Sequence, residues 1–150
     1  MKVERSIEIA APPERVYEVI MDPLCLERWV TIHAALEEAP AGALERGSRL
    51  TQQLELAGRC FTVHWTVVEN HRARRVVWEG RGPMRSKAII ENRLTEQDGG
   101  THYRYRNEFK APFGPLGATA QRVVAGGIPE REALASLENL KRLAESRVRA

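Results

Sequence analysis

The 150-residue chain lacks most of the features that mark metal, disulfide-stabilised or membrane proteins. Its only two cysteines, Cys25 and Cys60, stand in no C-x-x-C or comparable ligand spacing, so we expect two buried thiols. No apolar run approaches the roughly 20 residues of a transmembrane helix. The opening "MKVERSIEIAA" alternates charged and apolar residues, unlike a signal peptide. These absences predict no metal, no integral membrane association and a cytoplasmic location.

The chain also has little excess of charge of either sign, since its formal net charge is only +3. The arginine-rich stretch "NHRARR" reads as a solvated turn rather than a phosphate-binding patch. No ladder of aromatic residues accompanies it, and only 6% of the chain is aromatic, which argues against a nucleic-acid partner. The sequence contains no G-x-S-x-G, Walker, Rossmann or H-E-x-x-H motif. We therefore expect no cofactor, and neither nucleophilic nor metal catalysis.

The first 30 residues predict one strand followed by two short helices. Residues 3–9 alternate apolar and polar side chains, which is the period of a strand. Pro12-Pro13 ends this strand and favours the first turn of a helix. Asp22-Pro23 starts a second helix, whose apolar face is expected to include Leu24 and Leu26 and to end at Trp29.

Residues 33–111 read as consecutive strands with alternating faces. One strand, which ends at Ala57-Gly58, and the next strand each place four residues on one face: Leu50, Gln52, Leu54 and Leu56, then Phe61, Val63, Trp65 and Val67. A further strand contains Val76, Val77 and Trp78. In the last hairpin we predict Gly99 and Gly100 at the centre of the turn. That register pairs Leu94 with Tyr105, Asn92 with Asn107, and Ile90 with Phe109, all on an apolar inner face.

The C-terminal third is predicted to be one long helical element, kinked or broken at Gly126-Gly127. Leu137, Leu140 and Ala144 share the face expected to point inward. An antiparallel sheet with one apolar face has to cover it, and only this element is long enough to do so. The pieces predict an α+β fold: a curved antiparallel sheet wrapped around a long C-terminal helix, with two short helices after strand 1. A gap is expected wherever the facing side chains do not meet.

Three stretches of the sequence carry a resemblance to a known family. "IAAPPERVYEVIMDPLCLERW", "VVENHRARRVVWEG" and "FGPLG" followed by "LASLENLKRLAE" resemble the polyketide cyclase/dehydrase-like branch of the START superfamily, also called SRPBCC or Bet v 1-like. The resemblance covers essentially the whole chain and implies a single START-like domain over residues 1–150. It implies a helix-grip fold with a deep hydrophobic cavity between the sheet and the C-terminal helix. Members include lipid carriers, hormone receptors and aromatic polyketide cyclases, and fold alone does not choose among them.

Candidate site residues are those that the patterns place on the inner face or at the mouth of such a cavity. Trp65 and Trp78 supply flat apolar walls, or plain core packing, while an inward amide either orients a ligand or bonds to its neighbours. Tyr103, Tyr105 and His33 are the candidates for an acid or base, against the alternative of ordinary packing. The expected ligand-binding set is Trp29, Gln52, Leu54, Trp65, Trp78, Asn92, Tyr103, Tyr105, Asn107 and Phe113.

The function expected from these residues is binding or transport of a hydrophobic small molecule, such as a lipid, a polyketide or an aromatic ring compound. The alternative is an aromatic polyketide cyclase or dehydratase that uses a cavity tyrosine or histidine as acid or base. A third possibility, an interaction module, requires a large exposed apolar patch or a basic groove. The sequence leaves open whether any reaction occurs and whether the chain is a monomer or a homodimer.

Overall fold

The computed structural model describes residues 1–110, 122 and 126–148, with side chains described up to residue 146 at the C-terminal end. Phe113 lies outside the described residues. The elements follow one another as β1 (Lys2–Ile9), α1 (Pro13–Ile20), η1 (Pro23–Cys25), α2 (Leu26–Trp29), β2 (His33–Glu38), β3 (Arg49–Leu56), β4 (Arg59–His71), β5 (Arg75–Arg81), η2 (Pro83–Arg85), β6 (Lys87–Gln97), β7 (Gly100–Lys110) and α4 (Ile128–Val148).

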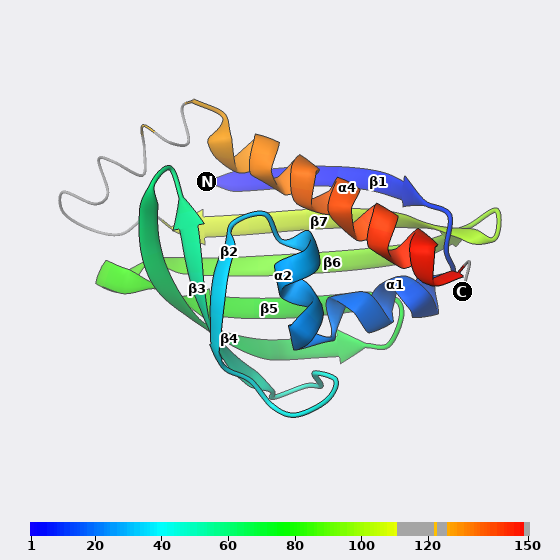
Figure 1. Ribbon diagram of the computed structural model, residues 1–150, viewed down its shortest axis with the longest axis horizontal. Coiled ribbons are helices and arrows are strands. Elements are labelled where there is room, and N and C mark those ends of the chain that lie inside the picture. Colours follow the sequence, from blue (N-terminus) through cyan, green and yellow to red (C-terminus); the bar gives the residue numbers. More distant parts are fainter. Residues whose placement is uncertain (111–121, 123–125, 149–150) are drawn as a thin grey trace.

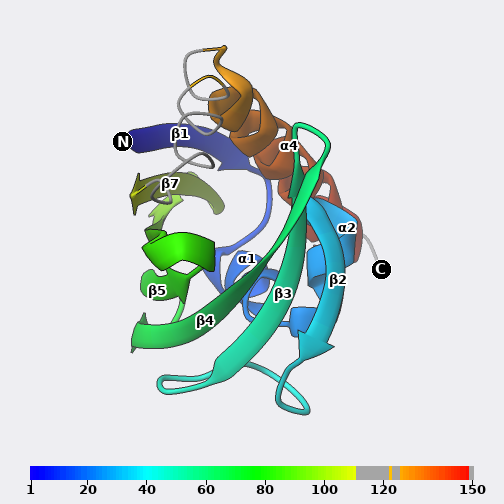
Figure 2. The same ribbon diagram turned by 90° about the vertical axis from the view of Figure 1, so that its left-hand side faces the viewer.

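The seven strands form one antiparallel sheet in the order β1-β7-β6-β5-β4-β3-β2. The sheet curls around the long helix α4, which crosses its concave face beside α1 and α2 (Figure 1). Seen end-on, β2, β3 and β4 bend toward α4 from one side while β1 and β7 lie on the other (Figure 2). This is the helix-grip α+β fold that the sequence predicts.

The two short helical segments form where Pro12-Pro13 and Asp22-Pro23 predict them. Pro12 is the N-cap of α1, and Oδ1 of Asp22 accepts a hydrogen bond from the backbone N–H of Leu24 at 3.0 Å. The prediction that Leu24 belongs to the apolar face is wrong, because its side chain is 74% exposed. The segment starts as a 3₁₀ turn that buries Pro23 and Cys25, and α2 then buries Leu26 and Trp29, which leaves Leu24 on the outer side.

The last hairpin has the predicted faces but a different register. Asp98 and Gly99, with φ of 54° and 80°, occupy the centre of the turn, the conformation that an Asp-Gly pair favours in a two-residue hairpin. Leu94 therefore pairs with Tyr103, Asn92 with Tyr105, Ile90 with Asn107 and Ala88 with Phe109. The predicted partners are wrong by two residues. Because side chains alternate with a period of two, this shift leaves every residue on its predicted face.

Helix α4 begins immediately after the Gly126-Gly127 turn, where Gly127 has φ of 73°. The part of the predicted helical element that precedes this turn lies largely outside the described residues. Leu137, Leu140 and Ala144 face inward as predicted, with exposures of 1%, 0% and 0%. The described part of α4, like every other described helix, is too short or too polar to cross a membrane.

Further contacts dock α4 onto the rest of the fold. Ser136 Oγ of α4 accepts a hydrogen bond from the Thr31 backbone N–H at 3.0 Å, just after α2. Lys141 donates to the backbone carbonyl of Glu8 in β1 at 2.9 Å.

The expectation for the cysteines is half right, since Cys25 is buried in the core whereas Cys60 is exposed at the start of β4.

Candidate functional site: a cavity between the sheet and the long helix

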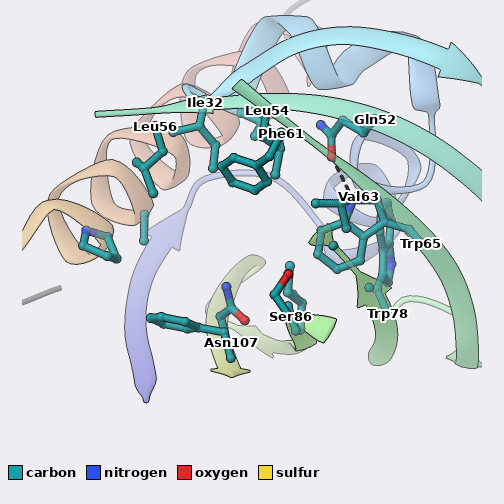
Figure 3. A pocket seen from close by; sticks show the side chains of 18 of the residues that line it. Ile32, Gln52, Leu54, Leu56, Phe61, Val63, Trp65, Trp78, Ser86 and Asn107 are labelled. Carbon is teal, nitrogen blue, oxygen red and sulfur yellow. Dashed lines mark hydrogen bonds between the residues drawn. The ribbon is translucent and has the colours of Figure 1, made fainter. Parts of the chain in front are cut away.

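A cavity of about 740 Å³ lies between the concave face of the sheet and the helices. Its walls are mostly apolar and come from nearly every element of the fold. Side chains from β3 and β4 form one wall and side chains from β5 to β7 form the facing wall (Figure 3), while α2 and α4 contribute further lining residues. Leu54, Phe61 and Val63 lie along the first wall, and Trp78 and Asn107 along the second. The gap expected between sheet and helix is present.

The pairing of β6 with β7 shows how far the cavity extends along these two strands. Ala88 and Phe109, paired across β6 and β7, line the outer part, and Ile90 and Asn107 follow one step deeper. Asn92 and Tyr105 come next and are also lining residues. The following pair, Leu94 and Tyr103, does not line the cavity and is buried in the core. The cavity therefore ends about where α1 packs on the sheet.

Trp65 and Trp78 form an aromatic part of the wall. Their ring centroids are 6.1 Å apart and the rings meet edge to face at 72°. The Trp65 ring lies directly on Gly80 of β5, where an added Cβ would be only 2.5 Å from Cζ3 of the indole. A glycine is thus required for this close approach. The sequence pattern placed both tryptophans inward but gave no signal for the role of Gly80.

A chain of hydrogen bonds holds the polar residues of this wall. Trp65 Nε1 donates to Oε1 of Gln52 at 3.0 Å, which leaves the amide nitrogen of Gln52 facing Nδ1 of His33 at 2.8 Å. Since the amide nitrogen can only donate, Nδ1 of His33 has to accept, and the ring is neutral with its proton on Nε2. Burial lowers the pKa of His33, while Glu27 acts in the opposite direction. His33 itself is not a lining residue.

The two tyrosines of β7 differ in their access to the cavity. The hydroxyl of Tyr103 donates to Oδ1 of Asn92, whose amide in turn donates to the carbonyl of Val76 at 3.3 Å. Tyr103 is fully buried, and burial raises its pKa well above the ordinary value. Tyr105 lines the cavity, and burial raises its pKa to about 12, with the Asn107 side chain partly offsetting this effect. Its phenol stays protonated at neutral pH and can donate a proton or a hydrogen bond.

Three polar atoms on lining residues are left without a hydrogen-bond partner in the described part of the chain. They are Nε1 of Trp29, Nε1 of Trp78 and Oδ1 of Asn107, and all three are shielded from solvent. A buried unpaired group costs about 1–3 kcal/mol, so a hydrogen-bonding partner for these atoms would be stabilising. The sequence singles out Asn107 as an inward amide, but it does not distinguish this amide from the satisfied Asn92.

The mouth of the cavity carries residues that sequence reasoning missed. Arg59, Lys87 and Lys110 are lining residues and are exposed. They come from the start of β4, the start of β6 and the end of β7, which lie at the end of the molecule that faces the viewer in Figure 2. A sequence signal existed, since each lies at a strand end next to a turn. Without the register, however, nothing indicated that the three ends converge.

The predicted set of ligand-binding residues is largely gathered at this cavity. Eight members line it: Trp29, Gln52, Leu54, Trp65, Trp78, Asn92, Tyr105 and Asn107. Tyr103 does not line the cavity but donates a hydrogen bond to Asn92, and Phe113 lies outside the described residues. Their roles toward a ligand stay predictions. Among the described residues, no cluster of three or more His, Cys, Asp or Glu side chains is arranged to hold a metal ion.

With the fold and the cavity established, the comparison with known proteins defines the class. The family model described as "Polyketide cyclase / dehydrase and lipid transport" matches residues 1–145. The chain belongs to this family.

Sequence relatives are distant. The chain is 22% identical to the protein named "Toxin Rv0910" of Mycobacterium tuberculosis over 131 residues, which cover 86% of this chain and 91% of that protein. It is 25% identical to "Uncharacterized protein Rv1546" of the same organism over 128 residues, covering 84% and 90% of the two chains.

Solved structures agree on the fold. The chain superimposes on the Zhui aromatase/cyclase from Streptomyces sp. R1128 with a TM-score of 0.80 and 20% identity, covering 100% of this chain and 96% of that one. The protein TTHA0849 from Thermus thermophilus gives a TM-score of 0.77 at 16% identity, with 98% and 99% coverage. At these identities the likeness shows the fold alone.

Proposed function

We propose that the protein binds or carries a hydrophobic small molecule in its internal cavity, acting as one domain over residues 1–150. The observation that supports this most strongly is the size and lining of the cavity. Protein interiors are normally close-packed, and a void of about 740 Å³ forfeits many van der Waals contacts. Ligand sites commonly have this order of volume, with apolar walls and a few polar groups.

The shape of the walls favours a ligand with a ring system or an acyl chain. The edge-to-face pair of Trp65 and Trp78 presents a rigid aromatic surface, and Leu54, Phe61 and Ile90 line the remaining walls. Rigid aromatic side chains contribute a large contact area and lose little conformational entropy on binding. The cytoplasmic location expected from the sequence fits such a role and stays a prediction.

The neutral fluorescent probe N-phenyl-1-naphthylamine tests this proposal. Saturable one-to-one binding, with probe enhancement and a change in tryptophan emission, is expected because three tryptophans line the cavity. Ile90→Trp, which fills the cavity, should weaken binding more than about tenfold. Ile89→Trp on the exposed side of the same strand is the matched control and should bind like the wild type, since Ile89 is 47% exposed. Equal binding by both variants would place the probe elsewhere.

The alternative function, an aromatic cyclase or dehydratase, is favoured by one observation. Tyr105 lines the cavity and stays protonated, so its phenol is suited to donate to a carbonyl or enolate oxygen of a bound substrate. It is not suited to act as a base near neutral pH. Incubation with a linear poly-β-ketone analogue should then produce aromatic absorbance that Tyr105→Phe abolishes. An unchanged rate in Tyr105→Phe would remove this candidate.

A further inference from the structure

The charged residues that line the cavity are of one sign. Arg59, Lys87 and Lys110 are the lining residues with a permanent charge at neutral pH, and no aspartate or glutamate is found among the described residues of the lining. The rest of the lining consists of apolar and polar side chains and includes His64. An otherwise apolar cavity therefore opens through a positively charged mouth.

Because side chains alternate along a strand, Lys87 and Lys110, which border the mouth, lie on the face of the sheet opposite to Ala88 and Phe109, in a row of cations across three strands. Lys87 of β6 pairs directly with Lys110 of β7 on one side and with Arg81 of β5 on the other. Neighbouring strands lie about 4.8 Å apart, and like charges directly opposite each other destabilise a sheet. Glu79 approaches Arg81 only at 3.8 Å, and both side chains are largely exposed. In the described part of the chain no carboxylate lies within ion-pair distance of Lys87.

The other side of the mouth contributes Arg59. This residue begins β4, and its alternation with Phe61 and Val63 places it on the inner face of the sheet. In Figure 2 the β3–β4 hairpin lies on one side of the molecule and the ends of β5 and β7 lie on the other. As for Lys87, none of the described carboxylates forms an ion pair with Arg59. The mouth thus has Arg59 on one side and Lys87 on the other, and the described residues provide neither of these two with a counter-charge.

We infer that the ligand is an amphipathic anion. Its apolar body fills the cavity, and its carboxylate or phosphate group stays at the mouth beside Lys87 and Arg59. This arrangement avoids moving an ionised group into the apolar interior, which is costly, and leaves that group partly hydrated. The positive field would guide such a ligand toward the opening. The inference rests on the proposed function and narrows its ligand class.

Matched ligands of one chain length test the role of charge. Dodecanoate, dodecyl phosphate and dodecan-1-ol, each below its micelle concentration, compete with N-phenyl-1-naphthylamine at pH 8 in low salt. The two anions should displace the probe at lower concentrations than the alcohol does. Lys87→Gln and Arg59→Gln should each reduce this preference by about threefold, as expected for a partly exposed ion pair. Arg46→Gln, in the loop between β2 and β3, removes an equal charge far from the mouth and should leave the preference unchanged.

The outcomes separate this inference from the function on which it rests. If the alcohol and the anions compete equally well, the cavity binds apolar molecules without using its charged mouth, and only the inference is overturned. If the probe itself does not bind in the cavity, the proposed function fails. If charge dependence appears only with phosphatidylglycerol vesicles and not with monomeric anions, the cations serve a membrane surface, which also overturns the inference. Loss of the preference at high salt would support it.

Discussion

Replacing Gly80 by alanine tests whether the aromatic wall of the cavity is packed as described. A methyl group at this position would lie 2.5 and 2.6 Å from Cζ3 and Cε3 of Trp65, and 2.9 Å from Cγ1 of Val63. Carbon atoms prefer a separation of about 3.5–4.0 Å, so the indole has to move by about 1 Å. Overpacking of this kind costs about 1–3 kcal/mol. Alanine also lowers the conformational entropy of the unfolded chain, which stabilises the folded protein by about 0.4–1 kcal/mol. The free energy of unfolding is therefore expected to fall by about 1–2 kcal/mol in total.

Urea unfolding followed by tryptophan fluorescence measures this loss, and thermal melting should show a drop of about 2–6 °C. The same substitution in a Trp65→Leu background is the matched control, since the methyl group then no longer meets an indole ring. The cost of Gly80→Ala should be clearly smaller there, which a double-mutant cycle quantifies. An equal cost in both backgrounds, or a Gly80→Ala protein as stable as the wild type, would refute the close packing of Trp65 on β5.

Three further substitutions test the polar groups around the cavity and the docking of α4. Burial raises the pKa of Tyr105 from 10.0 to about 12, so the unfolded chain loses its proton first and stability falls between these pH values. Tyr105→Phe should lessen that fall when stability is measured by urea unfolding. If stability fell as steeply with pH as in the wild type, the raised pKa of Tyr105 would be contradicted. Burial lowers the pKa of His33, so the unfolded chain binds the proton first and stability falls as pH drops through about 6.5. In His33→Leu the fall in stability that comes from protonating His33 should vanish. If stability depended on acidic pH in the same way in the variant and the wild type, the lowered pKa of His33 would be contradicted. Ser136→Ala removes the acceptor of the Thr31 N–H and should cost about 1 kcal/mol in chemical denaturation. Ser146→Ala, on the exposed side of α4, is its control, and equal losses would mean that the contact has no special role.

The faces of the strands could be predicted from the sequence because alternation is a local property. Trp65, Trp78 and Asn107 all face the cavity as their positions in the pattern predict. The partners across β6 and β7 could not be predicted as safely. "DGG" offers two possible turn centres, and the choice shifts every pair by two residues. Asp98-Gly99 forms the turn because aspartate followed by glycine suits a left-handed pair of residues.

Features that depend on several distant segments of the chain could not be predicted from the sequence. Arg59, Lys87 and Lys110 meet at the mouth only because the ends of three strands converge there. Leu24 was placed inward by assuming a regular helix, whereas the segment begins with a 3₁₀ turn. The close approach of Trp65 to Gly80 likewise follows from pairing between β4 and β5, which no local pattern reveals.

The location of a bound probe tests the account most directly. With isotope-labelled protein and N-phenyl-1-naphthylamine, nuclear Overhauser contacts report which side chains touch the naphthalene ring. We predict contacts to the methyl groups of Leu54 and Ile90 and shifts of the Trp65 and Trp78 indole signals, because these residues line one cavity. Contacts confined to exposed residues such as Ile89 or Leu24, with the indole signals unmoved, would contradict the account.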